Sequence, residues 1–203
     1  MNLSSYEYYK NSRDLAWRIL IDFNISSLPV DVAALCDKLG IRVYTYKNGR
    51  RLIDALGLTE YINGNDGFST VVNGNYIIFY SEDVNSSGRI LFTISHELGH
   101  ILLGHVKGSN IATRWNNQNK QPPDPMETAA NVFASRLLAP ACVLHEIGIS
   151  DVDEIMDITG LSHAAAQIRL NRLNTLNQRN KFYLNPLERQ VLGQFKGFIE
   201  KYK

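Results

Sequence analysis

The sequence predicts an α+β fold, in which a short β-sheet is backed by two long helices and followed by C-terminal helices. Two runs rich in β-branched and aromatic residues, 67–72 and 76–80, flank Asn73-Gly74, the dipeptide typical of a two-residue hairpin turn. Two other segments, 87–103 and 126–138, carry apolar residues at helical spacing. The 203 residues are 44% hydrophobic, which is enough for one sizeable core or two small ones.

Two further helices are predicted near the N-terminus. Residues 4–23 place apolar side chains at three- and four-residue spacings, as an amphipathic helix does. A short helix is predicted over 31–39, with Asp31 as its N-cap and Gly40 ending it in a left-handed turn.

Residues 41–46 are predicted to form a strand, so that the sheet has three or more strands. The segment 47–60 stays unassigned, because Asn48-Gly49 signals a turn while the residues after it suit a helix. Residues 107–124 are polar and rich in Asn and Pro, and a loop is expected there.

We expect one unit over residues 1–150 and a helical region over 151–203. Since no Pro- or Gly-rich linker separates them, the second region could be a separate module or part of the same core.

Composition excludes several classes of protein. The 21 Lys and Arg against 20 Asp and Glu give a net charge of +1, so no overall charge drives the chain onto nucleic acid or a membrane. Cys36 and Cys142 are too few and too far apart for a disulfide framework, and we expect reduced thiols. With no apolar run of about 18 residues and no signal-peptide pattern at the start, the expected compartment is the cytoplasm.

The sequence His96-Glu97-Leu98-Gly99-His100 lies inside the predicted helix 87–103. Residues four apart on a helix are separated by about 40° around its axis, so both imidazoles project to one side and can share one Zn²⁺. The motif can also arise by chance, but the histidines lie nearly opposite the apolar stripe of this helix, which consists of Leu91, Ile94, Leu98, Ile101 and Leu102.

A catalytic zinc site needs a third protein ligand and an open position for water. His105 is one candidate, although a continuing helix would turn it toward the apolar stripe, unless Gly104 ends the helix. Glu127 is the better candidate, because it lies at the start of the helix 126–138, beside its apolar face. A capping box that begins at Asp124 explains Glu127 equally well, and spacing alone leaves both interpretations open.

Asn131 lies one helical turn after Glu127, where its side chain could orient a ligating imidazole. The residue that would stabilise the oxyanion is left open, because His105, His163 and several tyrosines could each reach the metal.

Two blocks, FTISHELGHILLGH at 92–105 and ETAANVFASRLLAP at 127–140, together resemble the ImmA/IrrE family of metallopeptidases. Weaker similarity extends over about residues 28–175. Many members of the family have Glu where this chain has Ala129, and Met where it has Ala139. Neither position holds a ligand in that family, so we interpret both differences as changes in packing.

The resemblance implies a small zincin-like domain in which His96, His100 and Glu127 bind Zn²⁺ and Glu97 is the general base. It also implies site-specific cleavage of a protein, typically a helix-turn-helix transcriptional repressor encoded nearby in a phage, mobile element or stress operon. We expect an extended substrate to pair with one strand of the hairpin 67–80, and we expect no membrane partner. The oligomeric state stays open.

The alternative function is a non-proteolytic DNA-binding or adaptor regulator with a zincin-like fold. Residues 153–173 have the helix, Gly-containing turn and helix character of a DNA-reading motif, and Arg169 and Arg172 lie in its second helix. Residues 164–203 hold eight Lys and Arg but only two acids. Such helix pairs are more often packing units, and such charge often makes only a solvated face, so nucleic acid is the less favoured partner.

Overall fold

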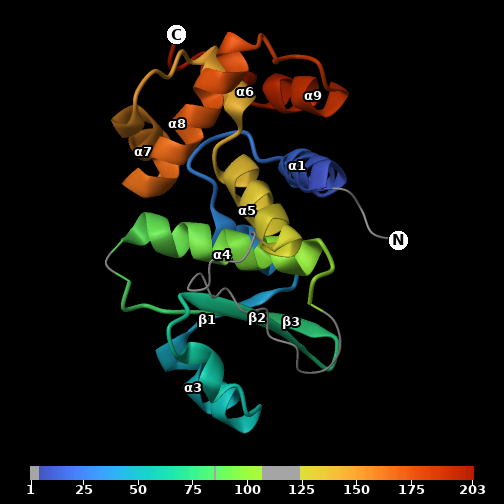
Figure 1. Cartoon of the computed structure of the whole chain (residues 1–203), viewed down its shortest axis with the longest axis vertical. Coiled ribbons are helices and arrows are strands. Elements are labelled where there is room, and N and C mark those ends of the chain that lie inside the picture. The colour runs from blue at the N-terminus through green and yellow to red at the C-terminus, as the bar shows by residue number, and fades with distance from the viewer. Residues whose placement is uncertain (1–4, 85, 107–123) are drawn as a thin grey trace.

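The computed structural model describes residues 5–84, 86–106 and 124–203. Figure 1 shows a layered arrangement: a small sheet with helix α3 (Tyr46–Ala55) on one face and α4 (Ser87–Leu102) on the other, α5 (Pro125–Leu138) across α4, and α1 (Ser5–Asp22) and the C-terminal helices beyond α5. The predicted α+β class is confirmed, and the expected loop at 107–124 lies almost wholly outside the described residues.

The sheet has three strands, β1 (Arg42–Thr45), β2 (Gly67–Val72) and β3 (Asn75–Tyr80), in the order β1-β3-β2. Strand β3 pairs in parallel with β1 and antiparallel with β2. Asn73 and Gly74 join β2 to β3 with φ angles of 49° and 78°, as a primed hairpin turn requires. The predicted hairpin is therefore confirmed, and within the described chain β2 is an edge strand.

The helices next to the sheet are α4 (Ser87–Leu102), α5 (Pro125–Leu138) and α2 (Val32–Lys38). Helix α4 contacts β2 and β3 on one side and α5 on the other, and α1 (Ser5–Asp22) packs on α5. Asp31 caps α2 by accepting a hydrogen bond from the Ala34 N–H at 2.9 Å, as predicted.

The C-terminal part consists of helices that pack against α1 and one another. One apolar core runs from Ala16 to Ile199 and is continuous across residue 150. The division into 1–150 and 151–203 stays a prediction. The remaining elements are η1 (Thr59–Ile62), α6 (Ala141–Glu146), α7 (Val152–Thr159), α8 (His163–Gln178), α9 (Pro186–Gln194) and α10 (Lys196–Ile199).

The segment that the sequence left unassigned contains helix α3 (Tyr46–Ala55). Thr45 caps it by accepting a hydrogen bond from the Asn48 N–H. Gly49 is helical, and a Cβ there would lie 2.5 Å from Cε1 of Phe79. This glycine serves close packing of α3 on the sheet, and the turn signal of Asn48-Gly49 was misleading.

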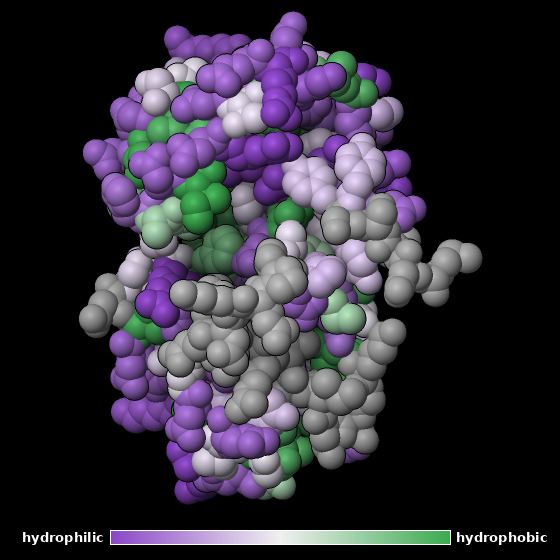
Figure 2. Space-filling view, viewed as in Figure 1, coloured by the Kyte–Doolittle hydropathy of each residue, from purple (hydrophilic) through white to green (hydrophobic). Residues whose placement is uncertain are grey.

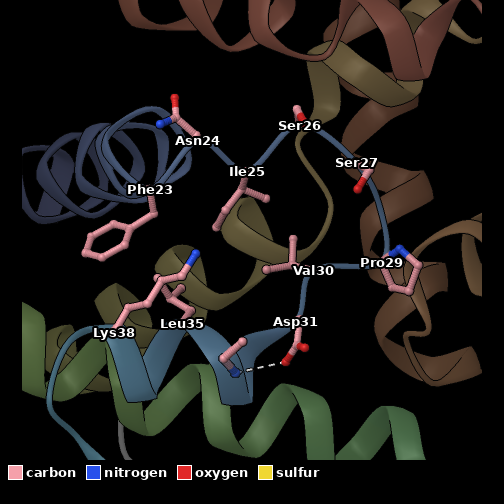
Figure 3. Close-up of a pocket in the computed structure, with 11 residues that line it drawn as sticks. Phe23, Asn24, Ile25, Ser26, Ser27, Pro29, Val30, Asp31, Leu35 and Lys38 are labelled. Atoms are coloured by element: carbon pink, nitrogen blue, oxygen red, sulfur yellow. Dashed lines mark hydrogen bonds between the residues drawn. The ribbon is translucent and has the colours of Figure 1, made fainter.

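The connection between α1 and α2 curves around a small cavity of about 230 Å³. Figure 3 shows Asp31 bonded to the start of α2 and the side chains of Phe23, Leu35 and Lys38 gathered on one side of the cavity. This connection ties the end of α1 to the helices beneath it.

Cys36 and Cys142 are buried and form no disulfide, as expected. Burial raises the pKa of both thiols to about 12, which leaves them unreactive near neutral pH. None of the helices in the described part of the chain is long and apolar enough to cross a membrane.

Gly99→Ala is expected to lower the free energy of unfolding by about 1–3 kcal/mol. Its new Cβ would lie 3.0 Å from Cδ1 of Phe133 and 3.3 Å from the Ala130 backbone, forcing α4 and α5 apart. Urea unfolding with a chelator present measures this change without a contribution from bound metal.

The matched control is Gly193→Ala in α9, where a Cβ meets nothing within 4 Å. It should stabilise the protein by about 0.5–1 kcal/mol through the lower entropy of the unfolded chain. Equal effects of the two substitutions would contradict the close packing of α4 on α5.

Candidate metal centre

The candidate centre lies in the middle of α4. Ser86 caps this helix by accepting from the Arg89 N–H, and its apolar residues Ile94, Leu98 and Ile101 are buried. Its polar residues are buried too: His96 and His100 are each 1% exposed and Glu97 is 2% exposed. Buried polar groups require partners, and the neighbouring elements supply them.

Glu127 in the first turn of α5 faces the two histidines. Its Oε2 lies 3.2 Å from Nε2 of His96, and its Oε1 lies 3.2 Å from Nε2 of His100. Asp124 caps α5 by accepting from the Met126 N–H, so capping is fulfilled by Asp124 while the carboxylate of Glu127 points to the imidazoles.

These three side chains have the spacing of a metal site. The Nε2 atoms of His96 and His100 are 3.0 Å apart, and each lies 3.2 Å from a different oxygen of Glu127, so the three side chains form a compact triangle around one point. A tetrahedral ion with bonds of 2.0–2.1 Å separates its ligands by about 3.3 Å. Oε2 of Glu127 is also buried without a hydrogen bond. The cluster could therefore hold a metal ion.

Asn131 and His105 contact the ring nitrogens that face away from this triangle. Oδ1 of Asn131 lies 3.0 Å from Nδ1 of His96, and Nδ1 of His105 lies 3.0 Å from Nδ1 of His100. Each contact suits an Nδ1–H donor on the ligating ring and so fixes the tautomer whose Nε2 lone pair faces the metal position.

His105 reaches this place because α4 ends just before it. Gly104 has a φ of +73°, and the chain turns back so that the His105 N–H donates to the His100 carbonyl. His105 was one candidate for the third metal ligand. The geometry instead makes it a partner of His100, on the side of that ring that faces away from Glu127.

Ser69 on β2 was missed by the sequence analysis. Its hydroxyl donates to Oε2 of Glu97 at 2.7 Å, and both side chains are buried. Two residues earlier, Gly67 permits the close approach of β2 to α4, because a Cβ there would lie 2.5 Å from Cγ2 of Thr93. No motif marks a serine at this position, since only the packing of the strand on the helix brings it to Glu97.

Electrostatics within the cluster favour a charged carboxylate. Burial would raise the pKa of Glu127, but the adjacent His100 and His96 lower it to about 2. Burial also lowers the pKa of His105 to about 4, aided by the charge of His100. At neutral pH, Glu127 is thus an anion and His105 a neutral ring that can accept the proton of His100 Nδ1.

Comparison with known families identifies this part of the chain. The sequence profile of the IrrE N-terminal-like domain, which defines a peptidase family, matches residues 36–171, more than half of the chain. The match includes both histidines of α4 and Glu127. The comparison with curated proteins gives no significant match.

Asn131→Ala is expected to weaken the binding of an added metal ion about tenfold to a hundredfold, because His96 loses the acceptor that orients its ring. Competition titration with a chromogenic chelator measures the affinity. Asn174→Ala on the exposed face of α8 is the matched control and should bind the metal ion as the wild type does. Unchanged affinity in both variants would contradict a positioning role for Asn131.

Proposed function

The chain belongs to the peptidase family defined by the IrrE N-terminal-like domain, and we propose that it is a zinc-dependent endopeptidase that cleaves a protein at one site. The observation that carries the proposal is the cluster of donor atoms from His96, His100 and Glu127 beside the buried carboxylate of Glu97. The family supports an activity of the metallopeptidase type. The metal, the endopeptidase activity and the substrate are our inferences.

Zinc is the ion that this donor set favours. Two imidazoles and one carboxylate match the three protein ligands of catalytic zinc sites, in which a water molecule completes the tetrahedron. Mg²⁺ and Ca²⁺ prefer oxygen ligands alone. When bound, zinc would lower the pKa of its water and polarise the scissile carbonyl.

Glu97 is the residue that would move the proton. It follows His96 and precedes His100 on α4, so its carboxylate lies on the same helix turn as these two residues. The hydroxyl of Ser69 holds one carboxylate oxygen and thereby orients the group. We infer that Glu97 accepts a proton from the attacking water and delivers it to the amine of the departing peptide.

A cleft of about 620 Å³ opens beside this centre, between α4, α5 and α8. Thr93 and Asn131 are among the residues that line it, and Phe92, Val132 and Ile168 contribute apolar surface. Figure 2 shows hydrophobic side chains gathered in the hollow between α8 and α4. We infer that this cleft binds an apolar side chain next to the cleaved bond.

The free edge for an extended substrate would be β2. Strand β3 is paired on both sides, so of the two hairpin strands only β2 could add a further strand among the described residues. Because β2 also carries Ser69, a peptide on this edge would run past Glu97.

The proposed substrate is a helix-turn-helix repressor encoded beside the gene, in the cytoplasm. It is supported by the resemblance of the two sequence blocks to the ImmA/IrrE family and by the family match.

The structure weakens the case for the alternative DNA-binding function. Helices α7 and α8 are joined through Gly160, as expected for the motif. However, Arg169 is buried and donates to the Ala139 carbonyl, and Arg172 donates to the Tyr9 hydroxyl. Neither guanidinium faces outward as a phosphate contact along DNA would require.

Glu97→Gln is expected to reduce cleavage of the neighbouring repressor about a hundredfold or more while retaining one zinc per chain. The amide preserves the shape of the side chain but cannot take a proton. Zinc content by mass spectrometry and fragment masses over time measure the two properties. Glu60→Gln, on the exposed η1, is the matched control.

Loss of zinc from Glu97→Gln would contradict the proposal that Glu97 transfers the proton without binding the metal. Cleavage by the wild type that survives removal of the metal would overturn the proposed metallopeptidase activity.

Ile168→Asp is expected to lower kcat/KM for the repressor about tenfold through the loss of apolar contact in the cleft. Ile168 is 70% exposed, so folding and zinc content should be unchanged. Leu184→Asp, which alters a similarly exposed residue outside the cleft, is the control. Equal kinetics for both variants would show that the cleft does not bind substrate.

A further inference from the structure

Another cavity, of about 390 Å³, lies between α1, α5, α8 and α9. We call it the arginine cavity, because Arg136, Arg169 and Arg172 converge on it from α5 and α8. Its volume falls within the range of small-molecule sites, roughly 300–1,000 Å³. Nothing in the proposed peptidase chemistry uses it.

Two of the three guanidinium groups are buried, Arg172 is half-buried, and all three lack carboxylate partners among the described residues. Arg169 is 2% exposed and Arg136 is 9% exposed. None of the three forms an ion pair with an acidic residue in the described part of the chain. Burial lowers the pKa of both Arg136 and Arg169, and each is lowered further by the charge of its arginine neighbours. Buried charges of one sign normally require a counter-charge.

Few of the available donors are used. Each guanidinium offers five N–H donors. Arg136 and Arg172 each donate to the Tyr9 hydroxyl at 2.8 Å, Arg136 also donates to the Ser135 hydroxyl at 3.4 Å, and Arg169 donates to the Ala139 carbonyl at 2.6 Å. Nε of Arg172 and Nε1 of Trp17, both from residues that line the cavity, are buried without any hydrogen bond. All of these unused groups are donors, so the missing partner is an acceptor.

Glu188, the one acidic residue among the described residues that line the arginine cavity, does not supply this partner. Burial raises the pKa of Glu188, and the backbone N–H groups at Tyr183, Leu184 and Asn185 lower it only in part. Asp14, on α1, is paired with Arg13 at 2.7 Å. The cavity therefore keeps an excess of positive charge.

We propose that the arginine cavity binds a small phosphate-bearing molecule. Guanidinium groups recognise phosphate through paired N–H donors, and a phosphate has enough oxygens for three arginines at once. Tyr9 holds Arg136 and Arg172 in place before binding, which reduces the entropy lost on binding. The depth of Arg169 suits a compact phosphate at the end of a small molecule, whereas a nucleic-acid backbone runs along a surface.

Isothermal titration of the zinc-loaded protein with sodium phosphate and with adenosine monophosphate tests the proposal. Both should bind at one site per chain, and a higher affinity for the nucleotide would identify a phosphorylated organic ligand as the better occupant. Arg172→Gln should weaken binding about tenfold to a hundredfold, while Arg51→Gln, which removes an exposed charge from α3, should leave it unchanged.

Binding that persists in Arg172→Gln would place the anion at the zinc or elsewhere and would overturn the proposal. So would the absence of binding at millimolar phosphate. The readout requires no peptidase activity, so it is independent of the proposed function.

A second variant guards against misfolding of Arg172→Gln. Tyr9→Phe removes the internal acceptor and leaves all three arginines in place. Phosphate should still raise the Tm of Tyr9→Phe, because the three guanidinium groups that would bind it remain in place. The absence of any rise would contradict contact between phosphate and these arginines.

Discussion

The structure depends on one constraint: α4 carries His96, Glu97 and His100 in the interior, where each polar atom needs a partner. Each neighbouring element provides one. Strand β2 supplies Ser69, the first turn of α5 supplies Glu127, and the next turn supplies Asn131. The sheet, α4 and α5 are thus held together by the same contacts that shape the candidate metal centre, as well as by apolar packing.

This arrangement also requires small residues where the layers meet. Gly67 lets β2 approach α4, and Gly99 lets α4 approach the backbone of Ala130 on α5. A side chain at Gly67 would move β2 away from α4, and a side chain at Gly99 would move α5 away from α4. Close packing at these two contacts therefore sets the distances within the centre, and a shift of about 1 Å would be enough to weaken it.

The sequence predicted the elements whose signals are local. The Asn73-Gly74 hairpin, the capped helix after Asp31 and the amphipathic patterns of α4 and α5 all lie within a few residues of the feature they predict. The proximity of His96 and His100 follows from helix geometry alone, whereas that of Glu127 needed the resemblance, because its spacing suits a capping box as well. Ser69 and Gly49 depend on contacts between distant segments, namely with Glu97 and with Phe79, so no local pattern reveals them.

Arg169 shows where charge counting fails and helical spacing does better. Counted along the chain, it belongs to a basic C-terminal region that suggested a solvated face or a nucleic-acid surface. Placed on its helix, it shares one face with Ala166, Leu170 and Leu173, all of which are buried. An arginine within an apolar stripe must bury its charge, so it requires an acceptor inside the protein or in a ligand. The Ala139 carbonyl accepts one of its hydrogen bonds, and the donors that remain are the physical basis for a bound anion.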